Sequence, residues 1–145
     1  MTTFLLDVNV LIALIDQFHV HHDISHDWFK KEGSESWASC PLTQNAVIRI
    51  VGNPRYPNSP GTPFEVAKIM KKFCELPGHV FFSDSLSIFD EKQINISRLL
   101  NSSQITDTYL LALASSKNSK LATFDKNLIT DSVINGDKFI YFLPT

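Results

Sequence analysis

The chain has few cysteines and glycines and no strong excess of charge of either sign. Its two cysteines, Cys40 and Cys74, stand far apart and lack the paired spacing of a zinc site. The five glycines are scattered singly, which excludes a glycine-rich phosphate-binding loop. A formal net charge of −2 gives no overall attraction for nucleic acid, so such a partner would be held by a local patch or through metal ions.

Membrane-spanning and targeting segments are also missing from the sequence. No apolar run reaches the roughly 20 residues that a transmembrane helix needs. The apolar N-terminus contains Asp7 and Asn9, has no basic region and lacks the small-residue cleavage site of a signal peptide. We therefore expect no membrane association and a cytoplasmic protein whose two thiols are buried and reduced.

The composition is that of one folded domain. Apolar residues make up 43% of the chain and charged residues 19%, which separates it from disordered proteins. With 145 residues and no repeat or low-complexity tract, we expect a single domain over residues 1–145. No serine or cysteine stands with a histidine at a spacing typical of nucleophilic catalysis.

The N-terminal stretch consists of two apolar runs that meet at Asp7. A single helix would place Asp7 and Asn9 inside an apolar cylinder, where a carboxylate without a partner is costly. We therefore predict a buried strand that ends at Asp7, followed by a helix with Asn9 in its first turn. Open α/β sheets bind ligands at the carboxyl ends of their strands, which makes Asp7 a candidate site residue.

Two further aspartates fit the same site. The stretch from Gln104 to Ala114 predicts a helix with Asp107 near its first turn, and residues 120–124 predict a short strand that ends at Asp125. If the strands that end at Asp7 and Asp125 are parallel neighbours, the three carboxylates converge on one edge of the sheet. Each of the two downstream aspartates also has a structural interpretation, because Asp107 can favour a helix start and Asp125 can cap a turn.

The rest of the sequence alternates between helical and strand patterns, which predicts an α/β fold with a mostly parallel sheet between helical layers. The predicted strands cover residues 36–40, 79–82 and 139–142. Of the predicted helices, the first covers residues 24–31 and the second is capped by Thr43 and runs to about Val51. A third starts at Thr62 and Pro63 and is expected to bury Val66, Ile69, Met70 and Phe73. A fourth runs roughly from Phe89 to Leu100.

Three segments have two interpretations each. The proline-rich segment from Asn53 to Pro63 is either a plain surface loop or the edge of a substrate groove. His22 and His26 stand one helical turn apart, which suits either packing or a zinc site, although no third ligand is evident nearby. Lysines 68, 71 and 72 form a basic helical face that we expect to be solvated.

The chemistry of three converging carboxylates favours a hard cation. Carboxylates gathered at one sheet edge repel one another unless a positive charge lies between them. Oxygen ligands suit Mg²⁺ or Mn²⁺, which keep several waters and bind substrate phosphate. Such a centre activates water and neutralises charge in the transition state, so hydrolysis of a phosphodiester is the predicted reaction.

On these residues the chain resembles a PIN domain, and specifically the VapC-type toxins of bacterial toxin–antitoxin pairs. The resemblance runs nearly end to end and keeps the order of the family's motifs. The segments that carry it are Leu6 to Leu11, Cys40 to Arg49 followed by Asn53 and Pro54, Thr106 to Leu110, Ala122 to Asp125, and the histidines from His19 to His22 ahead of Trp28.

The resemblance implies a three-layer α/β/α sandwich and a Mg²⁺- or Mn²⁺-dependent endoribonuclease that is often homodimeric and is inhibited by a cognate antitoxin. It assigns Asp7, Asp107 and Asp125 to three acidic metal-binding positions and Asn9 and Thr123 to supporting polar positions.

The fourth position of the family's site, usually glutamate, falls on Gln44 as a further supporting residue. An amide oxygen brings no charge, which leaves open whether one metal or two bind. Arg49 and Arg55 are candidates for contacts with RNA phosphates. The alternative function is a catalytically weak PIN-like module that binds RNA or a protein partner.

Overall fold

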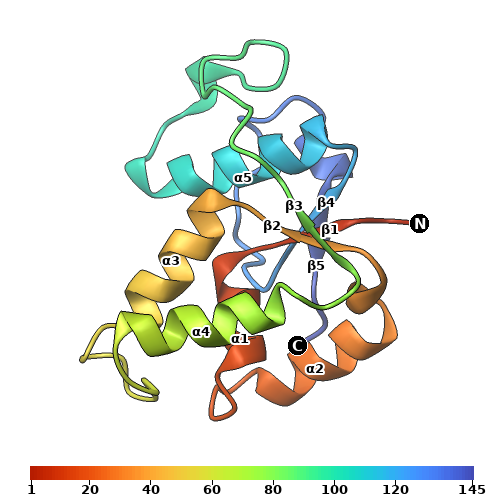
Figure 1. The fold of residues 1–145 in the computed structure, drawn as a ribbon. Helices are drawn as coiled ribbons and strands as arrows, with labels where there is room; N and C mark the ends of the chain where they lie inside the picture. The colour runs from red at the N-terminus through yellow and green to blue at the C-terminus, as the bar shows by residue number, and fades with distance from the viewer.

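The computed structural model describes all 145 residues, and its centre is a five-stranded parallel sheet (Figure 1). The strands lie in the order β3-β2-β1-β4-β5, and every neighbouring pair is parallel. Their bounds are β1 (Phe4–Leu6), β2 (Trp37–Ser39), β3 (His79–Phe81), β4 (Lys120–Thr123) and β5 (Ile140–Phe142). The predicted sheet and the predicted adjacency of the strands before Asp7 and Asp125 are confirmed.

Helices cover both faces of the sheet, which confirms the three-layer α/β/α arrangement. Figure 1 shows α5 on one side of the sheet and α1, α2 and α4 on the other. Two separate hydrophobic cores fill the spaces between these layers. The helices are α1 (Val8–Ile15), α2 (His22–Lys31), α3 (Pro41–Val51), α4 (Pro63–Phe73) and α5 (Ile105–Ser116). No helix combines the length and the hydropathy that crossing a bilayer needs.

The side chains of β1 are buried on both faces of the sheet, and the strand leads directly into the cap of α1 at Asp7. Phe4 and Leu6 belong to the core under α1 to α4, whereas Leu5 belongs to the core under α5. Because successive side chains of a strand point to opposite faces, this buried strand is apolar at every position. Asp7 follows directly and its carboxylate caps α1 by accepting a hydrogen bond from Val8 N at 2.8 Å.

The start of α3 differs from the prediction. The helix begins at Pro41 and its N-cap is Cys40, so the assignment of Thr43 as the cap is wrong. Thr43 is the third helical residue, and its hydroxyl accepts a hydrogen bond from Cys40 N at 3.0 Å in a capping box. Proline at the first helical position has the φ angle that a helix needs, and the helix starts three residues earlier than predicted.

The helix predicted from Phe89 to Leu100 is wrong. This segment forms turns and a short 3₁₀ turn, η2 (Ile96–Arg98), and Ile94 forms an isolated antiparallel bridge with Val133. The backbone here bonds to another segment of the chain: Asn95 N donates to Ser132 O at 2.8 Å and Ile134 N donates to Gln93 O at 2.9 Å. Partners far away in the sequence therefore override the local apolar spacing.

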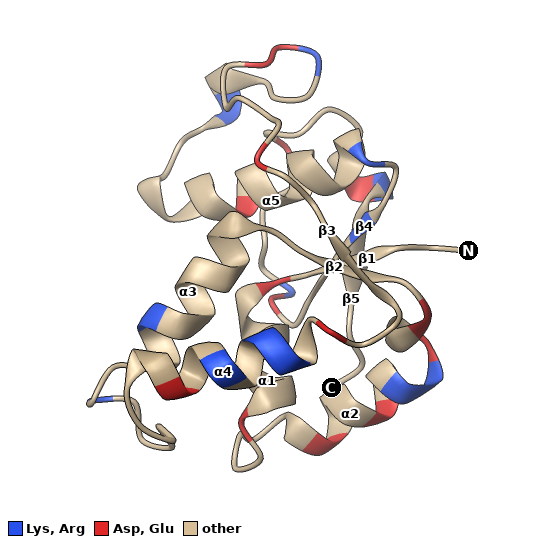
Figure 2. Ribbon diagram, in the orientation of Figure 1, with Lys and Arg blue, Asp and Glu red and all other residues tan.

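Helix α4 begins as predicted, because Thr62 caps it and Pro63 occupies its first position. Its buried face is narrower than predicted: Val66 and Met70 are buried, but Ile69 is 37% exposed. Lysines 68, 71 and 72 lie in solvent, as expected, and α4 carries several blue bands in Figure 2.

The two histidines one turn apart belong to the packing of α1 and α2. The ring of His22 bonds to Ala13 O at 2.7 Å and the ring of His26 bonds to Leu14 O at 2.9 Å. These carbonyl groups lie in the last turn of α1, where intrahelical partners run out. Both rings are therefore used in holding α2 against α1, and no third histidine, cysteine or acidic side chain joins them in a metal-binding group. Both cysteines are free, with Cys40 buried and Cys74 half-buried.

Candidate active site

The site is built at the carboxyl ends of β1 and β4. Asp7 N donates a hydrogen bond to Ala122 O at 2.9 Å, which extends the pairing of the two strands to the aspartate itself. Asp7 is 7% exposed and lies at the base of the site, whereas Asp125 follows Thr123 and Phe124 into solvent. The two strands therefore bring Asp7 and Asp125 to one sheet edge from positions more than a hundred residues apart in the chain.

Thr123 joins the polar groups of this edge. Its hydroxyl donates to Asp7 Oδ2 at 2.7 Å and accepts from Asp125 N at 3.1 Å. Asn9 Nδ2 also donates to the same hydroxyl, at 3.5 Å. Thr123 is fully buried, so it fixes Asp7 and the backbone of Asp125 relative to each other without contact with solvent. The supporting positions predicted for Asn9 and Thr123 are next to Asp7 in the structure.

Asp107 approaches the other two carboxylates from the first turn of α5. Burial raises the pKa of its carboxyl to about 6, and the charges of Asp7 and Asp125 add to the rise. Burial also raises the pKa of Asp7, against hydrogen bonds from Thr123 and Val8 N that lower it, and the charge of Asp125 raises it further. The negative charges of neighbouring aspartates thus make it harder for Asp7 and Asp107 to ionise.

The structural roles weighed for the downstream aspartates are present beside this grouping. Asp125 Oδ1 accepts a hydrogen bond from Asn127 N at 2.9 Å, which caps the turn after β4. Asp107 stands in the first turn of α5, where a negative charge favours the helix. Neither role removes the mutual repulsion, because each leaves carboxylate oxygens free to face the others.

The donors of this site fit a hard divalent cation. All of them are oxygens, and Asn9 Oδ1 is buried without any hydrogen-bond partner. A cation would give that oxygen a partner and would offset the burial and the repulsion that raise the pKa of Asp7 and Asp107. The three acidic side chains do not stand close enough together in the structure to form a complete metal-binding group by themselves.

Gln44 lies in the first turn of α3 but its side chain is held by β2. Its amide nitrogen donates to Ser39 Oγ at 3.0 Å, and Ser39 in turn bonds to the ring of His79 at 2.8 Å. Ser39 follows Ala38, whose side chain packs under α5, so Ser39 points to the opposite face. Gln44 is therefore hydrogen-bonded to β2 and forms no hydrogen bond with any of the three aspartates.

The proline-rich loop lies at the far end of α1 from Asp7. Asp16, which ends this helix, accepts hydrogen bonds from Tyr56 at 2.5 Å and from Asn58 at 3.0 Å. Burial raises the pKa of Asp16, but the hydrogen bonds outweigh burial and the net pKa is lowered. An eight-residue helix spans about 12 Å, so the loop is held well away from the carboxylates.

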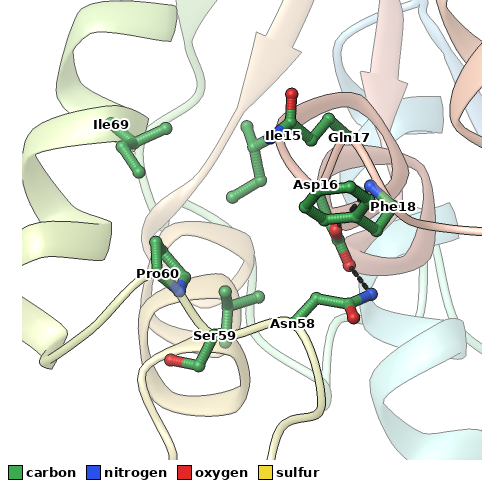
Figure 3. Close-up of a pocket in the computed structure, with 9 residues that line it drawn as sticks. Ile15, Asp16, Gln17, Phe18, Asn58, Ser59, Pro60 and Ile69 are labelled. Atoms are coloured by element: carbon green, nitrogen blue, oxygen red, sulfur yellow. Dashed lines mark hydrogen bonds between the residues drawn. The ribbon is translucent and has the colours of Figure 1, made fainter.

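The loop forms one wall of a hollow of about 360 Å³ that α1 and α4 complete (Figure 3). Figure 3 shows Asn58 and Pro60 on the loop side and Ile69 on the α4 side. None of the three aspartates lines this hollow. Arg55 belongs to the loop and Arg49 to the last turn of α3, and both side chains are exposed. Neither arginine belongs to a strand or helix that carries one of the three aspartates.

The structure adds residues that sequence reasoning did not select. Tyr109, two residues after Asp107, donates a hydrogen bond from its hydroxyl to the carboxylate of Asp84, which follows β3. Gln104, just before α5, is 4% exposed and bonds to the turn ahead of it. The sequence shows only a glutamine at the start of the predicted helix, and its hydrogen-bond partners belong to a turn that the sequence did not predict.

Comparison with known proteins gives concordant matches. The family model of the PIN domain matches residues 4–130. Ribonuclease VapC44 of Mycobacterium tuberculosis is 40% identical over 134 residues, which cover 92% of this chain and 94% of that protein. Ribonuclease VapC29 of the same organism is 35% identical over 143 residues, which cover 99% and 98%. Ribonuclease VapC38 is 32% identical over 126 residues, 87% of each chain.

A solved structure has the same fold. The crystal structure of VapBC2 from Rickettsia felis bound to a DNA fragment from their promoter matches with a TM-score of 0.56. The match covers 87% of this chain and 90% of that chain at 13% sequence identity. At that identity the likeness concerns the fold alone.

Proposed function

The chain belongs to the PIN-domain family and is homologous to the VapC ribonucleases, and from this premise we propose that it is a divalent-metal-dependent endoribonuclease that acts as the toxin of a toxin–antitoxin pair. The observation that supports the metal dependence is that Asp7 and Asp125 lie near enough to Asp107 for their charges to raise its pKa, with the unpartnered oxygen of Asn9 two residues after Asp7. RNA is the substrate and the cytoplasm is the place of action.

Asp7, Asp107 and Asp125 would hold Mg²⁺ or Mn²⁺, and Asn9 would orient a ligand beside them. When bound, the cation supplies an activated water and neutralises charge that develops on the phosphate. Thr123 favours the ionised form of Asp7 and fixes its position, because its hydroxyl donates to the Asp7 carboxylate. The graded burial, from buried Asp7 to exposed Asp125, leaves the site open on the side from which a phosphodiester can approach.

The remaining expected residues have supporting roles in this proposal. Gln44 is an uncharged neighbour of the site that reaches the metal or its waters only by leaving Ser39. Arg49 and Arg55 contact RNA phosphates outside the cleavage centre, since both side chains are exposed and stand on the last turn of α3 and on the proline-rich loop. Replacement of either arginine by alanine removes one phosphate contact. The slope of the logarithm of RNA affinity against the logarithm of salt concentration should then become shallower by roughly 1.

The partners in this proposal are a cognate antitoxin and a second copy of the chain. An antitoxin would silence the site by placing an arginine or lysine against the three carboxylates, which lack any basic partner in the structure. Homodimer formation is supported by exposed apolar side chains such as Phe89 and Leu100, which are 73% and 77% exposed. Light scattering of the purified protein tests the dimer directly.

The deciding experiment is an RNA cleavage assay with purified protein in Mg²⁺ or Mn²⁺. Cleavage that stops on addition of a chelator and returns with excess metal supports the proposal. The matched Asp7→Asn variant keeps the shape of the side chain and removes its charge, so it controls for a contaminating nuclease. RNA binding without cleavage in the wild type would favour the alternative of a catalytically weak RNA-binding module.

A further inference from the structure

Asp107 differs from Asp7 in how its carboxylate is held. Asp7 accepts hydrogen bonds from Thr123 and from Val8 N. Asp107 accepts no hydrogen bond, and the single ion pair of the structure, between Lys68 and Glu65, lies on α4. The position of the Asp107 carboxylate therefore comes entirely from the first turn of α5. Helix ends fray readily, so an unsupported first turn would not hold a repelled carboxylate in place.

The turn ahead of α5 is clamped by one buried side chain. Gln104 is 4% exposed, and its Oε1 accepts from Leu100 N at 2.9 Å and from Asn101 N at 3.0 Å. Its Nε2 donates to Arg98 O at 3.2 Å. One amide thereby satisfies three backbone groups in the segment that leads into α5, although Gln104 forms no capping bond to the helix itself. The clamp lies three residues before Asp107.

A second buried contact holds the other side of the same turn. The hydroxyl groups of Thr108 and Ser132 lie 2.6 Å apart, and both side chains are fully buried. Ser132 O also accepts a hydrogen bond from Asn95 N, so the contact is part of a larger junction with the C-terminal region. Asp107 thus sits between Gln104 and Thr108, each of which is tied to a different segment of the chain.

We propose that Gln104 and the Thr108–Ser132 pair are positioning elements that hold the Asp107 carboxylate in the metal centre against repulsion from Asp7 and Asp125. This inference rests on the proposed function, because it gives these residues a role toward the cation. Residues that orient metal ligands act through the ligand and not through contact with the ion. Gln104 and Ser132 themselves touch neither substrate nor metal.

The test uses two variants that remove the contacts by different routes. Gln104→Leu keeps the bulk of the side chain and removes all three hydrogen bonds, whereas Ser132→Ala removes the partner of Thr108 from outside α5. Thr62→Ala is the matched control, because it removes the cap of α4, a helix that carries none of the three aspartates. Binding of Mn²⁺ is measured by calorimetric titration, and hydrogen exchange of the α5 amides is followed in metal-free protein.

We expect Gln104→Leu and Ser132→Ala to weaken Mn²⁺ binding about tenfold, at the lower end of what residues behind metal ligands contribute. The control should bind Mn²⁺ as the wild type does, even if its Tm falls by a similar amount. In an Asp107→Asn background, Gln104→Leu should cause little further loss, because it acts through the carboxylate that is already gone. Amides in the first turn of α5 should exchange faster in both variants.

Three results would overturn the proposal in distinguishable ways. Unchanged Mn²⁺ affinity in both variants refutes the positioning role and leaves the metal centre intact. An equal loss with and without the Asp107 carboxylate shows that Gln104 acts on something else. If the wild type binds no Mn²⁺ at all, the metal centre of the proposed function fails, and unchanged exchange of the α5 amides then refutes the anchoring as well.

Discussion

The raised pKa of Asp107 predicts that this residue destabilises the metal-free protein at neutral pH. Its pKa rises from the ordinary value of 3.8 to about 6, through burial first and through the charges of Asp7 and Asp125 second. At about 1.4 kcal/mol for each tenfold change in proton affinity, the rise corresponds to about 3 kcal/mol. Because the carboxyl is partly exposed, solvent screening reduces this to roughly 1.5 kcal/mol.

The sign and the pH window follow from the direction of the change. The folded protein holds a proton on Asp107 at pH values where the unfolded chain has already released it. The free energy of unfolding therefore falls as the pH rises from about 4 to about 6, and above that range the loss is complete. Asp107→Asn cannot ionise, so this variant should be more stable than the wild type by about 1.5 kcal/mol at pH 7.5 and equally stable near pH 4.

Urea unfolding with a chelator present, at pH 4 and at pH 7.5, measures this difference. Asp131→Asn is the control for the loss of one negative charge, since Asp131 is exposed and accepts no hydrogen bond. Addition of Mn²⁺ at pH 7.5 should stabilise the wild type more than Asp107→Asn, because a ligand stabilises the folded protein more the more tightly it binds. If Asp107→Asn is no more stable than the wild type at pH 7.5, burial and the charges of Asp7 and Asp125 do not raise the pKa of Asp107 in the folded protein.

The other predictions concern the residues around this carboxylate. Asp7→Asn should abolish RNA cleavage with little change in Tm, and full activity in that variant would remove Asp7 from the site. Thr123→Val should lower cleavage about tenfold or more, since it frees both Asp7 and the backbone of Asp125; unchanged kcat and metal requirement would show that the hydroxyl positions nothing. Gln44→Glu should tighten Mn²⁺ binding, because a carboxylate cannot donate to Ser39 and gains from turning to the cation; unchanged affinity in calorimetry places residue 44 outside the site. Expression of the wild-type chain alone should slow growth and expression of Asp7→Asn should not, and equal tolerance of both would favour an inactive module.

The sequence was sufficient to predict the sheet edge because local patterns determine it. An apolar strand that ends abruptly in a carboxylate occurs at Asp7 and again at Asp125, and burial on both faces of a parallel sheet explains both runs. The parallel pairing of β1 with β4 then follows from alternation of strands and helices. The start of α4 was predicted for the same reason, because Thr62 and Pro63 act locally.

The failures lie where a distant segment supplies the partners. The apolar residues from Phe89 onward have spacing that suits a helix, but residues 132–134 take the hydrogen bonds of Gln93 and Asn95 and the helix does not form. The direction of Gln44 depends on Ser39 and His79, which come from two other strands. No pattern within a short window of sequence contains that information.

The arrangement of the carboxylates explains why one site would accept both a metal and an inhibitor. Asp7 is expensive to bury as a charge, and its hydrogen bonds from Thr123 and Val8 offset only part of that cost. Asp107 has no such partner and keeps its raised pKa. A divalent cation and a cationic side chain from an antitoxin would both neutralise the same excess charge. Binding of either should therefore stabilise the fold and exclude the other.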